Sequence, residues 1–175
     1  MQCAVFFFSR AGGNYVSGHI VNLKVGNTQQ AAEKIAALLQ APLAEIKAKE
    51  TYPQDYHECT RLAEAELKQE ARPELSQDPD PAPFDTVILC YPCWWGTFPR
   101  PVASFLEKHD FAGKTIIPVC THEGSGMGQS ERELKKLLPK AKIRQGLPLY
   151  GSRCQDGRAD ADIERFFRRH PALQS

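Results

Sequence analysis

The amino-acid sequence predicts an α/β fold, in which an open, doubly wound parallel sheet of five strands carries helices on both faces. Short apolar runs alternate with longer amphipathic segments, and this strand–helix order repeats five times along the chain. The apolar runs show little polar alternation, which is typical of strands covered on both faces. With 175 residues, of which 42% are hydrophobic, we expect a single domain over residues 1–175 with a substantial core.

Composition and charge exclude several classes of protein. The formal net charge is +1, which provides no basic excess for binding nucleic acid. No apolar stretch approaches the length of a membrane span. The apolar residues 1–9 lack a basic leader, so we interpret them as a strand rather than a signal peptide. Cys3, Cys90 and Cys120 lie inside apolar runs, which argues against a disulfide framework and favours a reducing, cytoplasmic location.

The first strand is predicted at residues 2–8, because nearly all of them are apolar. Residues 11–25 are rich in glycine, and we expect a loop or a small excursion there. Gly26-Asn27-Thr28 begins a helix, since Asn27 or Thr28 can cap its free N–H groups. The apolar stripe of this helix comprises Ala31, Ala32, Ile35, Leu38 and Leu39. A second strand follows at about residues 41–46.

The middle of the chain contains a helix, a connecting loop and the third strand. We predict a polar helix over residues 55–69, with an inner face of Tyr56, Leu62, Ala63 and Leu67. Residues 71–84 contain Pro73, Pro79, Pro81 and Pro83, which predict a connecting loop because proline lacks the backbone donor. A buried strand follows at residues 85–91. After a loop with two tryptophans, a helix over residues 99–108 buries Val102, Phe105 and Leu106.

The last part of the chain supplies two more strand–helix units. The fourth strand is predicted at residues 114–121, and the glycine-rich segment 122–128 follows it. A helix over about residues 129–138 leads to a fifth strand at about residues 141–150. The closing helix over residues 160–170 has Ile163, Phe166 and Phe167 on its inner face and Arg165, Arg168 and Arg169 on its outer face.

Three unusual loops each follow a predicted strand: residues 9–28, 92–96 and 121–128. In open parallel sheets, ligands bind outside the carboxyl ends of the strands, where the strand order reverses. These loops therefore converge on one edge if the predicted fold is correct. Their coincidence is stronger evidence for a ligand site than any one of them alone.

Each loop has a structural and a functional interpretation. Gly26-Asn27-Thr28 is an ordinary helix cap, or with Ser9 a phosphate site at the helix N-terminus. Trp94 and Trp95 either plug the core or offer an indole to a flat aromatic ligand. In the third loop, glycines allow close backbone approach, whereas His122 alone is more often a loop histidine than a catalyst.

The phosphate motifs that are missing narrow the ligand class. The chain lacks the Gly-x-x-x-x-Gly-Lys-Ser/Thr loop of nucleotide triphosphatases. It also lacks a Gly-x-Gly-x-x-Gly dinucleotide motif after the first strand. An aromatic mononucleotide fits best, with its phosphate on the first loop and its ring between the second and third.

Several longer motifs resemble the flavodoxin-like proteins of bacteria over nearly the whole chain. They are Phe8-Ser9-Arg10 with Gly26-Asn27-Thr28, Trp94-Trp95-Gly96-Thr97-x-Pro99-x-Pro101, Phe105-Leu106-Glu107, Phe111-x-Gly113-Lys114-Thr115-Ile116-Ile117-Pro118 and Cys120-Thr121-His122-Glu123-Gly124-Ser125-Gly126. The resemblance implies the strand order 2-1-3-4-5, with non-covalent FMN bound between the first and third strands.

The resemblance also assigns parts of an FMN site to residues of this chain. Its phosphate residues are Ser9, Arg10, Gly26, Asn27 and Thr28. Those implied to flank the isoalloxazine ring are Pro92, Cys93, Trp94, Trp95 and Gly96. The opposite side of the ring is implied to be closed by Thr121, His122, Glu123, Gly124, Ser125 and Gly126.

Two departures from the family pattern bear on the role. An insertion separates Ser9 from Gly26, where many flavodoxins run directly from strand to phosphate loop. Many electron-carrying flavodoxins are also strongly acidic, which steers them to basic partners, whereas this chain is nearly neutral. The expected partners are redox proteins or small electron acceptors.

Four functions remain to be weighed. The first is a flavodoxin-type electron carrier, in which the protein binds and tunes the flavin. The second is an FMN-dependent NAD(P)H:quinone-type reductase, for which His122 or Tyr91 could donate a proton. A more remote one is a thiol oxidoreductase that uses Cys90 and Cys93 as a C-x-x-C pair. The fourth is a response regulator. That function needs an aspartate where the third strand ends, and this chain has Cys90 or Tyr91 there, so the sequence argues against it.

Overall fold

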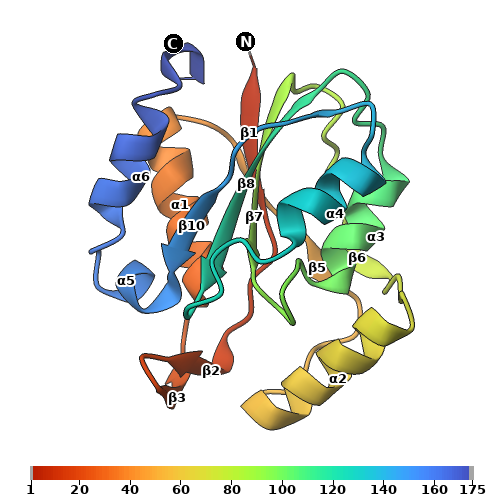
Figure 1. The fold of residues 1–175 in the computed structure, drawn as a ribbon, viewed down its shortest axis with the longest axis vertical. Helices are drawn as coiled ribbons and strands as arrows, with labels where there is room; N and C mark the ends of the chain where they lie inside the picture. The colour runs from red at the N-terminus through yellow and green to blue at the C-terminus, as the bar shows by residue number, and fades with distance from the viewer. Residues whose placement is uncertain (1, 174–175) are drawn as a thin grey trace.

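A parallel sheet with helices on both faces forms the centre of the protein (Figure 1), as a computed structural model of residues 2–173 shows. Its strand order is β4-β1-β7-β8-β10, and every neighbouring pair is parallel. The strands are β1 (Cys3–Phe7), β4 (Leu43–Glu45), β7 (Thr86–Pro92), β8 (Thr115–His122) and β10 (Leu147–Tyr150). The predicted order 2-1-3-4-5 is confirmed.

The fifth position of the sheet is divided into two strands, where the sequence predicts one over residues 141–150. The short strand β9 (Lys142–Ile143) pairs with Thr115 and Ile116 of β8, and β10 pairs further along β8. Between them the N–H of Gly146 donates to the Glu131 side chain instead of to β8. The ladder is therefore interrupted, because this donor is used by a side chain.

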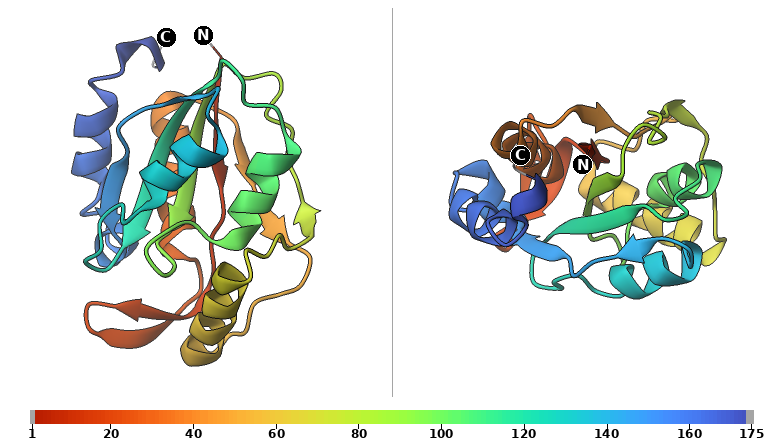
Figure 2. Two further views of the ribbon diagram at one scale, coloured as in Figure 1. Left: turned by 45° about the vertical axis from the view of Figure 1, so that its right-hand side comes forward. Right: turned by 90° about the horizontal axis from the view of Figure 1, so that it is seen from above.

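Two apolar cores lie on opposite faces of the sheet (Figure 2). One face is covered by α1 (Asn27–Leu39), α5 (Gly151–Gln155) and α6 (Asp160–Phe167). The other face is covered by α3 (Arg100–Lys108) and α4 (Ser130–Leu137), and α2 (Tyr56–Lys68) packs at the side of α3. Helix α5 is absent from the predicted elements, and η1 (Pro171–Leu173) extends the chain past α6.

Helical spacing identified most of the buried helix residues, but it failed at two leucines. Val102, Phe105 and Leu106 of α3 are buried as predicted. Leu38 of α1 and Leu62 of α2 are instead 38% and 39% exposed. In α2 the buried residues are Cys59 and Ala63, so this helix approaches its neighbours through small side chains.

Antiparallel strands replace two segments that the sequence predicts as loops. The glycine-rich insertion forms a hairpin of β2 (Gly12–Val16) and β3 (His19–Leu23). Ser17 and Gly18 have φ of 50° and 85°, as a two-residue hairpin turn requires. In the proline-containing segment 71–84, β6 (Leu75–Gln77) pairs with β5 (Lys47–Ala48). Both pairs are too short for their periodicity to be read reliably.

None of the helices in residues 2–173 is long and apolar enough to cross a membrane. All six cysteines lie within these residues and are free thiols.

Candidate functional site

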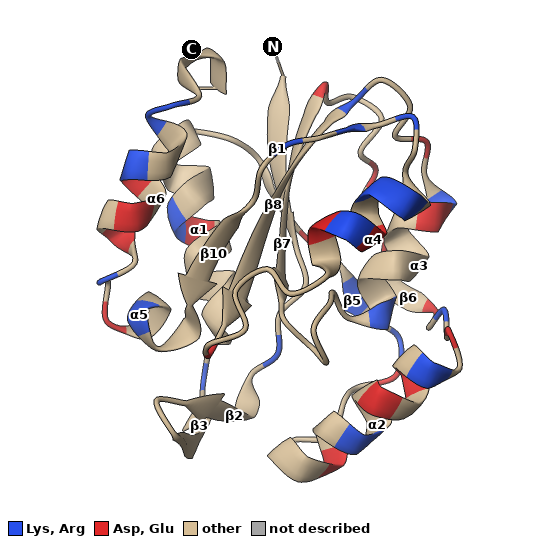
Figure 3. Ribbon diagram, in the orientation of Figure 1, with Lys and Arg blue, Asp and Glu red and all other residues tan. Residues whose placement is uncertain are grey.

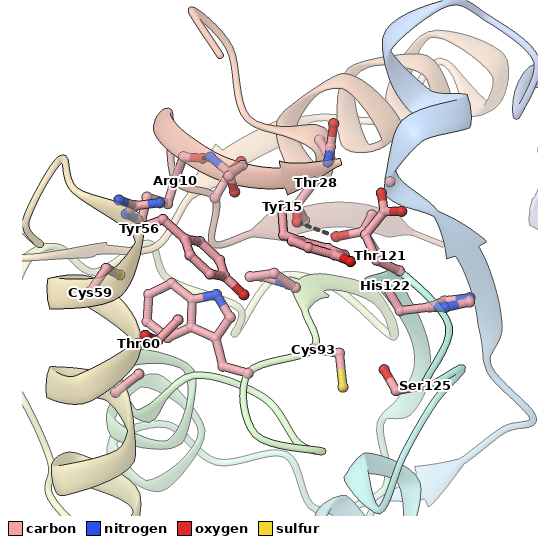
Figure 4. Close-up of a pocket in the computed structure, with 18 of the residues that line it drawn as sticks. Arg10, Tyr15, Thr28, Tyr56, Cys59, Thr60, Cys93, Thr121, His122 and Ser125 are labelled. Carbon is pink, nitrogen blue, oxygen red and sulfur yellow. Dashed lines mark hydrogen bonds between the residues drawn. The ribbon is translucent and has the colours of Figure 1, made fainter. Parts of the chain in front are cut away.

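A pocket of about 400 Å³ lies at the carboxyl edge of the sheet (Figure 4). Its walls come from the start of α1, the β2–β3 hairpin, α2 and the loops that follow β7 and β8. The lining residues are Ser9, Arg10, Asn14, Tyr15, Asn27, Thr28, Tyr56, Cys59, Thr60, Ala63, Pro92, Cys93, Trp94, Trp95, Thr121, His122, Glu123, Ser125 and Gly151. The three loops selected from the sequence therefore do meet in space.

All of the predicted site residues line this pocket except four glycines: Gly26, Gly96, Gly124 and Gly126. Gly124 and Gly126 instead line a neighbouring groove. Gly26 lies behind the pocket wall, where a Cβ atom would overlap the Ser9 hydroxyl and come 2.6 Å from the Arg10 carbonyl oxygen. Glycine at position 26 is required for the close approach of the segment after β1 to the start of α1.

The sequence analysis missed the walls that the hairpin and α2 supply. The pocket residues it did not identify are Asn14, Tyr15, Tyr56, Cys59, Thr60, Ala63 and Gly151. Tyr15 belongs to the insertion, and a tyrosine between glycines in a supposed loop was the only available signal. Nothing in the pattern of α2 showed that this helix stands beside the sheet edge.

The start of α1 offers unpaired backbone donors to the pocket. Ser9 Oγ accepts a hydrogen bond of 3.1 Å from the N–H of Gln29, and no side chain caps the helix at Gly26. Within residues 2–173, the N–H groups of Asn27 and Thr28 have no hydrogen-bond partner. Free N–H groups and the helix dipole together favour an anion at this end of the pocket.

Two side chains at this end are held by neighbouring elements. Thr28 and Thr121 share a buried hydrogen bond of 2.7 Å between their hydroxyl oxygens, which joins α1 to the end of β8. Asn27 Oδ1 accepts a hydrogen bond of 2.6 Å from Gln155 Nε2. These contacts leave little conformational freedom, so the polar end of the pocket is largely preformed.

Arg10 has backbone partners on two different elements. Its guanidinium donates to the carbonyl oxygen of Gly13 in β2, and to those of Pro53 and Gln54 at 2.6 and 2.8 Å. The N–H of Gly13 in turn donates to the Gln54 carbonyl at 2.9 Å. Arg10 therefore fastens the hairpin to the segment before α2, and its role toward a phosphate stays a prediction.

Glu123 connects the hairpin to α5. Its carboxylate accepts from the N–H of Ser17 in the hairpin turn at 3.2 Å, and from the N–H of Ser152 at 2.8 Å. Gly151 is packed against this arrangement, since a Cβ atom there would lie 3.1 Å from Glu123 Oε1. The tip of the hairpin is thus anchored across the pocket from its Arg10 end.

The two tryptophans have different environments. Trp94 packs edge-on against Phe8 and Tyr52, with ring centroids 5.3 and 5.0 Å away, so this pocket-lining side chain is partly buried against the core. Trp95 is 53% exposed, and its Nε1 donates to the Thr60 carbonyl at 2.9 Å. Trp95 is therefore the indole available to a flat ligand.

A tight turn separates these two side chains. The backbones of Trp94 and Thr97 bond to each other, and Trp95 and Gly96 between them have φ of 54° and 81°. Glycine adopts this left-handed conformation easily, whereas for a non-glycine residue it raises the conformational free energy by about 1–2 kcal/mol. The strained backbone of Trp95 places its indole at the pocket.

Three aromatic side chains from different elements line the pocket. Tyr15 comes from the hairpin and Tyr56 from α2 (Figure 4), and Trp95 comes from the loop after β7. The rings of Tyr15 and Tyr56 are tilted by 31°, with centroids 6.2 Å apart. A planar ring system would meet apolar faces here, while its polar end meets the start of α1.

His122 is poorly suited to donate a proton. Its Nδ1 accepts a hydrogen bond of 2.9 Å from the N–H of Gly124, and its ring lies 4.6 Å from that of Tyr150. Burial lowers the pKa of His122, which favours the neutral imidazole.

Two cysteines, Cys59 and Cys93, line the pocket, and of these Cys93 has the pKa that is lowered towards neutrality. Hydrogen bonding from the Cys120 thiol, with further donors at Ser125 and Gly96, lowers the pKa of Cys93 to about 6. Burial instead raises the pKa of Cys59 to about 11. The environment of Cys93 therefore favours its thiolate form.

The C-x-x-C pair expected from the sequence does not assemble. Cys90 is fully buried in the core on the α1 side of the sheet, whereas Cys93 packs on the α3 side. Burial also raises the pKa of Cys90. Thiols on opposite faces of a sheet cannot exchange a disulfide, so this geometry does not favour the thiol oxidoreductase.

A parallel sheet of this order, with a helix N-terminus and an aromatic pocket at its carboxyl edge, defines a nucleotide-binding α/β protein. The chain belongs to the flavodoxin family, whose model matches residues 20–163. A comparison with curated protein sequences gives no match.

Solved structures with this fold include proteins assigned as flavoproteins. One from Bacteroides uniformis is 25% identical, with a TM-score of 0.74 over 95% of this chain and 97% of that one. Another, from Bacteroides eggerthii, is 26% identical, with a TM-score of 0.70 over 91% and 96%. A flavoprotein in complex with FMN from Lactobacillus acidophilus is 16% identical, with a TM-score of 0.63 over 89% and 97%.

The environment of Cys93 predicts selective alkylation. Iodoacetamide should modify Cys93 before the other cysteines, with a half-maximal rate near pH 6, because the thiolate is the reactive form. Mass spectrometry over a pH series measures this rate. Cys93→Ser should abolish the fast phase, and a midpoint near the ordinary thiol value of 9.0 would contradict the assigned environment.

The contacts of Arg10 predict that Arg10→Ala loosens the hairpin. The Gly13 N–H should exchange with solvent about tenfold faster, because the hairpin then opens locally more often. Hydrogen exchange followed by NMR measures it. Arg61→Ala, at an exposed position on α2, is the matched control. Equal protection in both variants would show that Arg10 does not hold the hairpin.

Proposed function

We propose that the protein binds FMN non-covalently in this pocket and transfers electrons through it. The observation that carries the proposal is the combination of free N–H donors at the start of α1 with three aromatic side chains in the same pocket. Family membership supports it, and a solved protein of the same fold is in complex with FMN.

The residues present fit such a ligand. A volume of about 400 Å³ lies within the usual range for small-ligand sites. Ser9, Asn27 and Thr28, with the N–H groups of the first turn of α1, would hold the phosphate. Trp95 and Tyr15 would pack on the ring system, and the loop after β8 would face its polar edge.

FMN when bound would supply the redox chemistry, and the protein would bind it, orient it and limit its contact with water. Trp94 and Phe98 are tied into the core beside the pocket, so the loop after β7 would present a rigid surface. The hairpin, anchored by Arg10 and Glu123, would cover the side opposite the sheet edge.

Electron transfer is favoured over the NAD(P)H:quinone reductase by the lack of a suitable proton donor. Nδ1 of His122 accepts a hydrogen bond and burial lowers the pKa of His122, so the ring is favoured in its neutral form, which is a weak acid. Tyr91, the other candidate, is buried and donates to Ser130 at 2.8 Å, and burial raises its pKa well above the usual value. An electron carrier needs neither group.

Substitutions at the two ends of the pocket test the FMN site. Thr28→Ala should weaken FMN binding, because it removes a hydroxyl and loosens Thr121 at the polar end. Trp95→Ala should raise the Kd about fivefold, a loss of about 1 kcal/mol of ring packing. Fluorescence titration of flavin into the FMN-free protein measures both.

Conservative variants control for misfolding in this experiment. Thr28→Ser keeps the hydroxyl and Trp95→Phe keeps an aromatic ring, so both should bind FMN nearly as the unaltered protein does. Unchanged affinity in both alanine variants would reject the site, provided that their thermal unfolding matches that of the conservative ones.

Stepwise reduction separates the carrier from the reductase. In an anaerobic spectroelectrochemical titration of the FMN-loaded protein, we expect two resolved one-electron steps. A single two-electron step, together with rapid reduction by NADPH, would favour the reductase. A protein that takes up no FMN would reject both functions.

A further inference from the structure

A second groove adjoins the pocket and is not used by the proposed function. It has a volume of about 600 Å³ and lies between α6, β10 and the loop after β8. Its apolar and aromatic lining includes Leu147, Pro148, Tyr150 and Phe166. His122 lines both the groove and the pocket, so the two share one wall.

The charges around this groove are unbalanced. Three arginines line it, Arg153, Arg165 and Arg169, against one carboxylate, Asp162. Arg153 and Arg165 both contact that carboxylate, at 3.0 and 3.3 Å. Within residues 2–173, no acidic side chain pairs with Arg169. The groove therefore carries an excess of positive charge.

This local excess contrasts with the rest of the surface. The formal net charge of the chain is only +1, and α2, α4 and α6 all carry charges of both signs (Figure 3), so the excess lies in the set of residues that line the groove. The arginines also stand on the rim of the groove, since the side chains of Arg153 and Arg165 are 40% and 67% exposed. Rim guanidinium groups suit a charged surface that approaches from outside better than a small anion enclosed in the groove.

The lining of the groove provides an aromatic connection to the pocket. Tyr150 is 48% exposed in the groove, and its ring centroid lies 4.6 Å from that of His122. His122 lines both the groove and the pocket, so a molecule seated on the groove lies next to the pocket. This proximity is what transfer of an electron between two proteins requires.

We propose that this groove is the docking site for a redox partner protein with an acidic contact surface. Guanidinium groups on the rim would pair with carboxylates of the partner, and the exposed Tyr150 would lie under the centre of the contact. The proposal rests on electron transfer through the pocket. It gives this chain the opposite polarity from acidic flavodoxins, which attract basic partners.

The test uses one haem protein in two charge forms. Native cytochrome c is basic, and succinylation of its lysines makes its surface acidic without replacing the haem. Stopped-flow mixing with the reduced, FMN-loaded protein gives the rate of electron transfer to each form. The rate to the succinylated form should be higher at low ionic strength and fall as salt is added, whereas the rate to the native form should not fall.

Two single substitutions just after the end of α6 locate the contact. Arg169→Ser should slow transfer to succinylated cytochrome c about fivefold at low ionic strength, because it removes the unpaired rim charge. Arg168→Ser makes the same change of charge on the next residue, which is exposed but does not line the groove. Its rate should stay close to that of the unaltered protein.

Other outcomes would overturn the proposal. Equal effects of the two substitutions would show that only net charge matters. Competition between NADPH and succinylated cytochrome c would assign the groove to a small nucleotide instead. Calorimetric binding of succinylated cytochrome c to the FMN-free protein provides a measure that needs no flavin, so a failure to bind FMN and a failure to dock are distinguished.

Discussion

The parallel pairing of β1, β7 and β8 is the constraint on which the rest of the site depends. Phe7 lies opposite Cys90, and Tyr91 lies opposite Cys120, so the three strands end at nearly the same level. Parallel strands place all of their carboxyl ends on one edge, and the loops that leave them must meet there. The hydroxyl pair of Thr28 and Thr121 then joins the start of α1 to the end of β8.

Hydrogen bonds between side chains and backbone groups hold the β2–β3 hairpin over one side of the pocket. The hairpin is a two-stranded sheet of its own, and such a unit is marginal in water without further contacts. Arg10 fastens its base and Glu123 its tip, each through backbone groups that would otherwise need water. The insertion thereby becomes a wall of the site, and it contributes Tyr15 to the pocket.

The charges of this protein are distributed unevenly over its surface, although its net charge is close to zero. A total of +1 suggested no electrostatic preference for any partner. The tertiary structure brings Arg153 of α5 close to Arg165 of α6 and to Arg169, which follows α6. Other acidic residues nearby are paired, Asp160 with Lys34 and Asp156 with Arg158. Association is steered by the field near the contact and not by the total charge, so a neutral protein can still select its partner.

The sequence by itself determined the parallel sheet with helices on both faces and most of the pocket, and its resemblance to flavodoxins implied the strand order. Apolar runs such as residues 86–91 and loops such as residues 121–126 are local signals, and parallel topology converts them into one site. Only the tertiary structure decided which tryptophan enters the core, where the hairpin folds, and that α2 supplies a wall. Those outcomes depend on contacts between residues far apart in the chain, such as Arg10 with Gln54 and Trp95 with Thr60, which no local pattern encodes.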